Sequence, residues 1–263
     1  MDLHLADKTA VVTGGSRGTG LAIVQTLLGE GMRVVTGSRR LTDELKETDA
    51  VHVPVDLATS DGATELISEA MAQLGGIDLL VNNVGIGDTD DLIKGALLDL
   101  RELPDSAWQQ TFDLHFYSAL RVTRAALPSL VERKGMIVNV SSAGARVVSA
   151  GPAHYNVAKA ALNALTKVMA EQFGSHGVRA VTVSPGPIST GVWTDDDGFI
   201  ARVAREQGIA HAAFVDQMMA SLGASTGRIS TPEEVARLVA FLASPNNITG
   251  TEHLIDGGIV KQL

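Results

Sequence analysis

The fold is decided by Thr13-Gly14-Gly15-Ser16-Arg17-Gly18-Thr19-Gly20, a glycine-rich run that follows an apolar, β-branched segment at residues 9–13 and opens a helix-like pattern at residues 18–28. Glycines allow a backbone to turn tightly and to approach a pyrophosphate, and a helix N-terminus supplies N–H groups and a positive dipole end. The spacing G-x-x-x-G-x-G between a strand and a helix therefore predicts a dinucleotide-binding site. The candidate binding residues in this run are Gly14, Ser16, Arg17, Gly18, Thr19 and Gly20.

Short apolar runs alternate with longer helical patterns along the rest of the chain. Strands that are apolar throughout, separated by helix-length segments, indicate βαβ units and a buried parallel sheet. Helices must then cover both faces of that sheet. We therefore predict an α/β fold with strands at residues 9–13, 34–36, 51–55, 77–81, 136–140, 178–183 and 252–255, and helices at 18–28, 61–74, 106–131, 153–173 and 232–242.

Two segments interrupt this alternation. Residues 86–104 are long for a connection between a strand and a helix, and residues 186–230 show no strand pattern. The second segment contains amphipathic stretches near residues 199–207 and 212–222, and a loop of this length in a compact domain is usually a lid or a binding segment. We predict a substrate lid at residues 186–230 within a single domain that spans residues 1–263, because no linker or internal repeat divides the chain.

Composition excludes several classes of function. The 263 residues include no cysteine, so we expect neither a disulfide framework nor a cysteine-ligated metal, and no other metal site is predicted. A formal net charge of −9 disfavours nucleic acids and anionic membranes as partners. The chain lacks an apolar run of about 18 residues and begins without the features of a signal peptide, so the expected location is cytoplasmic.

The end of the second predicted strand bears on the choice of dinucleotide. A site for NAD carries an acidic residue about 20 positions after the glycines, where it binds the ribose 2′-hydroxyl. Here Ser38 stands near that place and is followed by Arg39 and Arg40. Guanidinium groups suit a 2′-phosphate, so NADP(H) is favoured over NAD(H). The alternative is that both arginines belong to a solvated strand end and pair with Asp43 or Glu44.

A candidate catalytic group lies in the predicted helix at residues 153–173. Tyr155 and Lys159 are four residues apart, which places the phenol and the ammonium on one helical face, and Ser142 lies thirteen residues before the tyrosine. A free tyrosine has a pKa of about 10, and a nearby positive charge is expected to lower it. Such a tyrosine exchanges protons with an oxygen atom at neutral pH. The structural alternatives are a packed aromatic ring, a solvated lysine and a serine that caps a turn.

With these motifs the chain closely resembles the short-chain dehydrogenase/reductase family, from about residue 8 to residue 258. The resemblance implies a single-domain Rossmann-type doubly wound sheet of about seven mainly parallel strands with helices on both faces. The segments that carry it are Thr13–Gly20, Asp56, Asn82-Asn83-Val84-Gly85, the group Ser142, Tyr155 and Lys159, Pro185-Gly186-Pro187-Ile188-Ser189-Thr190, and Asp256-Gly257-Gly258.

The resemblance also implies a function. It is that of an NADP(H)-dependent oxidoreductase, with ketone reduction expected, that exchanges hydride with a small carbonyl or secondary alcohol and forms a homotetramer or homodimer. By resemblance Tyr155 is the proton donor, Ser142 polarises the carbonyl oxygen, and Lys159 binds the nicotinamide ribose. The further implied cofactor-binding residues are Ser38, Arg39, Arg40, Asp56, Leu57, Asn83, Gly85, Tyr155, Lys159, Pro185, Gly186, Ile188 and Thr190.

The chain departs from the family pattern at one candidate catalytic position. The family usually has an asparagine seven residues after a tryptophan, and counting from Trp108 leads to His115. That asparagine holds a water molecule in a proton relay, and a histidine ring also donates and accepts hydrogen bonds. His115 either takes part in such a relay or only fills space between helices. This departure keeps open the alternative of a catalytically impaired dinucleotide-binding or regulatory protein.

Overall fold

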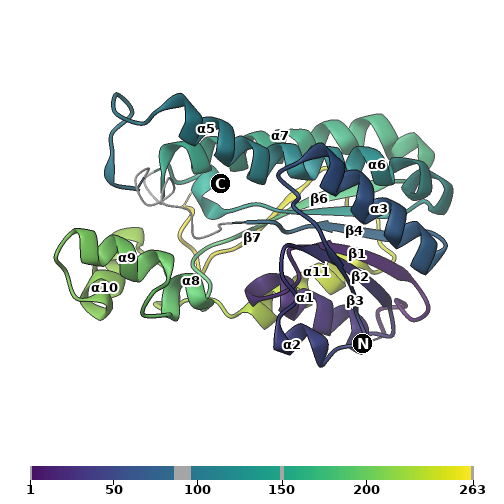
Figure 1. The fold of residues 1–263 in the computed structure, drawn as a ribbon, viewed down its shortest axis with the longest axis horizontal. Helices are drawn as coiled ribbons and strands as arrows, with labels where there is room; N and C mark the ends of the chain where they lie inside the picture. Colours follow the sequence, from purple (N-terminus) through teal and green to yellow (C-terminus); the bar gives the residue numbers. More distant parts are fainter. Residues whose placement is uncertain (1, 86–95, 149–150, 262–263) are drawn as a thin grey trace.

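A computed structural model describes residues 2–85, 96–148 and 151–261, so most of the predicted connection at 86–104 lies outside the described residues. The described chain forms one sheet of seven strands in the order β3-β2-β1-β4-β5-β6-β7, and every neighbouring pair is parallel (Figure 1). The predicted fold class is confirmed. The strands are β1 (Thr9–Thr13), β2 (Arg33–Ser38), β3 (Val51–Pro54), β4 (Leu79–Asn82), β5 (Met136–Val140), β6 (Arg179–Pro185) and β7 (Glu252–Ile255).

Helices cover both faces of the sheet. Figure 1 shows α1 and α11 on one face and α3, α6 and α7 on the other, while α8, α9 and α10 project beyond one end of the strands. The larger helices are α1 (Gly18–Gly29), α3 (Ser60–Leu74), α5 (Asp105–Phe112), α6 (Ser118–Arg133), α7 (Ala153–Phe173) and α11 (Pro232–Ala243). Those outside the predicted set are α2 (Asp43–Lys46), α8 (Gly191–Thr194), α9 (Phe199–Glu206) and α10 (His211–Leu222).

The predicted helix at residues 106–131 is wrong in one respect, because it is not a continuous α-helix. A π-helical segment, Asp113–Tyr117, joins α5 to α6. A π-helical turn contains one more residue than an α-helical turn, so it shifts the side chains that follow around the helix axis, and such turns occur frequently at functional sites.

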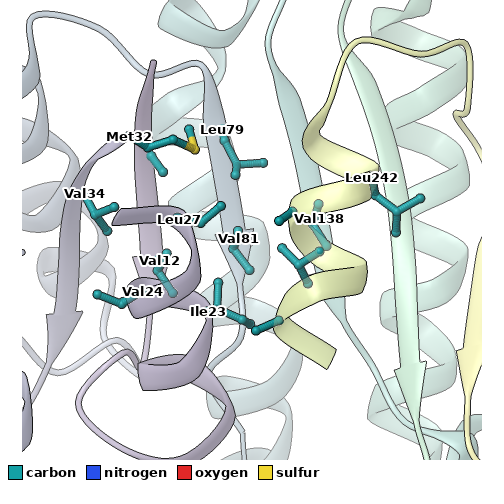
Figure 2. Close-up of a cluster of buried hydrophobic side chains, with 14 of the residues drawn as sticks. Val12, Ile23, Val24, Leu27, Met32, Val34, Leu79, Val81, Val138 and Leu242 are labelled. Atoms are coloured by element: carbon teal, nitrogen blue, oxygen red, sulfur yellow. The ribbon is translucent and has the colours of Figure 1, made fainter. Parts of the chain in front are cut away.

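The period of two along each strand divides the core between the two faces. In β1, Val12 packs on one side with Ile23 and Leu27 of α1, as Figure 2 shows, and Val11 packs on the other side with Leu66 of α3. All five side chains are fully buried. Each large apolar side chain removed from water in this way contributes about 1.5–3 kcal/mol to folding. Because both faces are covered, nearly all side chains of the central strands β1, β4, β5 and β6 are buried, whereas the edge strands β3 and β7 are partly exposed.

A chain of buried polar side chains crosses the sheet beneath α7. Asn82 Nδ2 of β4 donates to Asn139 Oδ1 of β5 at 2.8 Å, and Asn139 Nδ2 donates to Thr166 Oγ1 of α7 at 2.8 Å. Thr182 of β6 also donates to Thr166 Oγ1, and Asn82 Nδ2 donates to Thr123 Oγ1 of α6. These directional bonds fix where α7 sits on the sheet, since apolar packing alone is not directional.

The order of the strands positions the site. The chain builds β1, β2 and β3 in one direction and then β4 to β7 in the other, so the direction changes between β1 and β4. In open α/β sheets, ligands bind outside the carboxyl ends of the strands at such a point. The glycine-rich run follows β1, and Asn83 to Gly85 follow β4, so both predicted segments lie there.

Candidate active site

A cavity of about 1240 Å³ opens at the carboxyl ends of the strands. Pockets for a single small ligand usually measure about 300–1,000 Å³, so this cavity has room for a cofactor and a substrate together. It is lined by all the predicted cofactor-binding residues and by Ser142. Among the predicted site residues, only His115 is not part of its lining.

Two glycines show why the run after β1 needs this composition. Gly14 has φ of +71°, a conformation that other residues adopt at a cost. A Cβ on Gly20 would lie 2.1 Å from the carbonyl oxygen of Gly14 and 2.5 Å from Asn83 Nδ2, so no side chain fits there. The first turn of α1 lines the cavity through Gly18, Thr19 and Gly20, and N–H groups at such a turn bind phosphate. This geometry fits the pyrophosphate of a dinucleotide.

Asn83 supports that turn rather than projecting away from it. Its Nδ2 donates to the carbonyl oxygens of Thr13 at 3.0 Å and Gly14 at 3.3 Å. Thr42, which the sequence analysis missed, donates from Oγ1 to the carbonyl oxygen of Ser16 at 2.6 Å. The glycine-rich turn is therefore held from both sides, by the loop after β4 and by the start of α2.

A residue of β3 that the sequence analysis missed, His52, contacts the end of β2. Ser38 Oγ donates to the carbonyl oxygen of Arg40 at 2.9 Å, and His52 Nε2 of β3 lies 2.9 Å from the same hydroxyl. Because the serine has one hydroxyl hydrogen, His52 Nε2 is the donor in the second bond. Arg39 and Arg40 are exposed where they line the cavity. Asp43, one of the two acids in the alternative pairing, lies 2.7 Å from Lys46 Nζ.

The candidate catalytic side chains meet between β5 and α7. Ser142 lies two residues after the end of β5, and its Oγ accepts a hydrogen bond from Gly144 N at 3.0 Å. Tyr155 and Lys159 lie one turn apart on α7, with Lys159 Nζ 5.9 Å from the centre of the tyrosine ring. The same Nζ donates to the carbonyl oxygen of Val140 at 2.8 Å, at the end of β5.

Burial dominates the protonation of this group. It raises the pKa of Tyr155 above 10.0, and a hydrogen bond with Ser142 acts in the opposite direction. Burial also lowers the pKa of Lys159 from 10.5 to about 7. The prediction that the ammonium lowers the tyrosine pKa is therefore wrong for this structure. Desolvation of the phenolate by burial outweighs the hydrogen bond with Ser142, and Lys159, with its own lowered pKa, is only partly charged at neutral pH.

His115 lies in the π-helical segment and packs against the tyrosine. The two rings form an edge-to-face contact with centroids 5.1 Å apart, and the histidine is 1% exposed. Neither ring nitrogen has a hydrogen-bond partner among the described residues. Burial holds the pKa of His115 well below 6.5, and the charges of Lys159 and His154 lower it further. The structure thus places His115 beside the catalytic candidate but outside the cavity lining.

Replacing His115 by asparagine should make folding less sensitive to acid. A histidine with a lowered folded-state pKa binds fewer protons in the folded than in the unfolded protein. The free energy of unfolding therefore falls as the pH drops below about 6.5, by about 1.4 kcal/mol per pH unit for one such group. Urea unfolding at neutral and mildly acidic pH measures this slope, with exposed His176→Asn as the control. Equal acid sensitivity in wild type and His115→Asn would contradict the expectation.

Glu252 of β7 joins the loop after Ser142 to the sheet. Its Oε2 accepts from Arg146 Nε at 2.8 Å, and its Oε1 accepts from Ser184 Oγ at 2.7 Å and from Asn163 Nδ2 at 2.9 Å. Arg146 is separated from Glu252 by 106 residues, so no local pattern could reveal this contact. Ser184 therefore supports the end of β6, as its position before the Pro185-Gly186 turn suggests.

The segment predicted as a lid forms α8, α9 and α10 at one end of the molecule (Figure 1). Phe199 and Val203 of α9 are buried against Phe214 of α10, and Tyr155 and Trp193 pack against this cluster. The predicted amphipathic stretches are thus helices whose apolar sides face each other and the tyrosine. Among the described helices, none has the length and apolar character needed to cross a membrane.

Known proteins resemble this chain along its length. A family model described as enoyl-(acyl carrier protein) reductase matches residues 14–260. The L-fucose dehydrogenase of Mus musculus is 32% identical over 258 residues, covering 95% of this chain and 88% of that protein. The 3-oxoacyl-[acyl-carrier-protein] reductase FabG of Vibrio cholerae is 31% identical over 266 residues, covering 98% of this chain and 99% of that one. The solved structure of L-sorbose reductase from Gluconobacter frateurii, complexed with NADPH and L-sorbose, covers 100% of both chains with a TM-score of 0.87 and 29% identity.

Proposed function

Because this chain belongs to the short-chain dehydrogenase/reductase family, we propose that it transfers hydride between NADP(H) and a ketone or secondary alcohol. Membership of the family makes it an oxidoreductase that uses a nicotinamide dinucleotide. The observation that carries the finer assignment is the meeting of Ser142, Tyr155 and Lys159 with the glycine-rich turn in one cavity.

The proposed mechanism uses the side chains between β5 and α7. The cofactor, when bound, supplies the hydride that a carbonyl carbon accepts. Tyr155 donates its proton to the carbonyl oxygen in reduction and takes it back in oxidation. Ser142 donates a hydrogen bond to the same oxygen and so polarises the carbonyl. Lys159 lies beside the tyrosine, with its Nζ 5.9 Å from the ring centre, and its amine hydrogens suit ribose hydroxyls.

NADP(H) is proposed over NAD(H) on the chemistry at the end of β2. Ser38, Arg39 and Arg40 line the cavity, and no acidic residue stands in their place. A hydroxyl and two guanidinium groups suit a 2′-phosphate, whereas an NAD site carries a carboxylate there. The NADPH complex of the sorbose reductase supports the same choice.

Replacing Arg39 by aspartate should exchange the cofactor preference. Hydrogen bonds between charged groups contribute about 1.5–3 kcal/mol, so NADPH affinity should fall about 10- to 100-fold while NADH affinity stays the same or rises. Fluorescence titration with each cofactor measures both. Arg124→Asp carries the same change of charge at an exposed site on α6 and is the control. An unchanged NADPH affinity in Arg39→Asp would refute the assigned role.

The direct test of the proposed reaction follows NADPH oxidation across a panel of ketones and aldehydes. Turnover that requires Tyr155 supports the proposal. NADPH binding without turnover of any compound would favour the alternative, a catalytically impaired dinucleotide-binding or regulatory protein, which the His115 departure motivates. The variant His115→Asn belongs in the same panel, because turnover in this variant alone would identify the histidine as the cause of inactivity.

Two further proposals concern the lid and the oligomeric state. Residues 186–230 are proposed as the substrate lid of a single domain, supported by the packing of α9 against Tyr155. Assembly as a homodimer or homotetramer is supported by Val157 and Val168, two apolar side chains of α7 that are 47% and 44% exposed. A molar mass measured by light scattering tests the second expectation, and a monomeric value contradicts it.

A further inference from the structure

The part of the cavity lined by residues 191–222, here named the lid half, is apolar next to Tyr155. Phe199, Ile200 and Val203 of α9 line it and are 3–6% exposed. The side chains of Trp193 and Tyr155 pack against the same cluster. A substituent of a carbonyl whose oxygen reaches the Tyr155 hydroxyl therefore meets aliphatic and aromatic carbon on the lid side.

The charges that line the cavity are divided between its two ends. Among the described lining residues of the lid half, the charged side chains are Asp195 and Asp197, both exposed, and Gln207 supplies an amide. The arginines lie at the opposite end, around the glycine-rich turn and β2, where Glu44 and Asp56 also line the cavity. Lys159 belongs to the reacting centre, where its Nζ donates to the carbonyl oxygen of Val140.

The apolar lining and the two aspartates of the lid half disfavour anionic and polyhydroxylated substrates. A carboxylate or phosphate in the lid half would lose water without gaining a described cation as partner, and would meet two negative charges at the rim. A polyhydroxylated compound would need a partner for each hydroxyl that leaves water, and the lid half offers few polar groups for this purpose.

We infer that the substrate is an uncharged, largely apolar ketone or secondary alcohol, one of whose substituents lies against the lid half. The inference rests on the proposed oxidoreductase function. Carbonyl compounds that carry a carboxylate or phosphate, and sugars, are poor substrates of this site.

The experiment compares matched substrates with NADPH as the reductant. Methyl ketones whose second substituent grows from ethyl to hexyl should show kcat/KM rising about fourfold per methylene group. The keto acid of the same length, with a carboxylate at the far end of the hexyl chain, should be at least about 100-fold poorer than methyl hexyl ketone. A ketohexose should be poorer than methyl hexyl ketone by a similar factor.

Reversing the charge of one aspartate at the rim of the lid half tests whether negative charge there disfavours anionic substrates. Asp197→Lys should raise the ratio of keto acid to ketone turnover roughly fivefold, and added salt should reduce this gain. Asp196→Lys is the matched control, because Asp196 is exposed beside it but does not line the cavity. Its ratio should change less than about twofold. Circular dichroism of both variants checks that they are folded.

The outcomes separate the two proposals. A flat chain-length series, or a preference for the keto acid or the ketohexose, overturns the inference and leaves the proposed function intact. If no compound oxidises NADPH although NADPH binds, the proposed function is overturned and the inference falls with it.

Discussion

Tyr155→Phe is expected to lower kcat/KM for carbonyl reduction by about 10²–10⁴, the usual contribution of a general acid. The substitution removes the hydroxyl that hydrogen-bonds with Ser142 and leaves the buried ring in place. The dissociation constant for NADPH should change by less than about threefold, because the ring still packs against His115 and the lid. Steady-state kinetics and fluorescence titration of NADPH measure the two quantities separately.

The other tyrosine of the chain, Tyr117, is the control for this experiment. Tyr117 is 42% exposed at the end of the π-helical segment and does not line the cavity, so Tyr117→Phe should retain its turnover. Turnover close to wild type in Tyr155→Phe would remove the proposed proton donor. Loss of both turnover and NADPH binding would instead indicate that the hydroxyl supports the cavity.

Lys159→Met is expected to abolish a strong pH dependence of stability and to lower turnover. The lysine has a folded-state pKa of about 7 against 10.5 for the free side chain, so the unfolded chain binds more protons between these values. The free energy of unfolding therefore rises by about 1.4 kcal/mol per pH unit between pH 7 and pH 10.5. It falls by the same amount per unit as the pH is lowered toward 7. A methionine does not titrate and removes that slope.

The comparison needs a matched lysine and a restricted range of pH. Lys167 lies on the same helix and is exposed, so Lys167→Met should keep the slope of the wild type. Measurements should stay below about pH 9.5, because the raised pKa of Tyr155 lowers stability as the pH rises beyond about 10. Urea unfolding at several pH values gives the slope of each variant, and equal slopes in wild type and Lys159→Met would show that the buried amine is not the titrating group.

The sheet could be predicted because its determinants are local. Apolar runs and helical spacing lie within short windows, and parallel pairing follows from the connections between them. The π-helical segment could not be predicted, since residues 106–131 show a continuous helical pattern and the extra residue per turn depends on what packs around His115. The short helix α2 is too small to produce a period.

The site, like the fold, has features that the sequence predicts and features that depend on contacts between distant segments. Its residue types and their positions along the chain could be found, because the glycine-rich run and Asn83 follow strands directly and Tyr155 and Lys159 have the spacing of one helical turn. The pKa of Tyr155 could not be predicted, since it depends on burial by a lid some forty residues further along the chain. The roles of His52 and Glu252 were also hidden, because their partners come from other strands and a distant loop.

The hydrogen-bonded side chains beneath α7 limit which substitutions the interior of this protein tolerates. Asn139 both accepts from Asn82 and donates to Thr166, so an isosteric leucine there would remove one of the two hydrogen bonds that Asn82 Nδ2 donates and one of the two that Thr166 Oγ1 accepts. Each buried hydrogen bond lost in this way costs about 0.5–1.5 kcal/mol. The three residues should therefore be exchanged as a set, and variants that change one of them alone should be less stable than wild type.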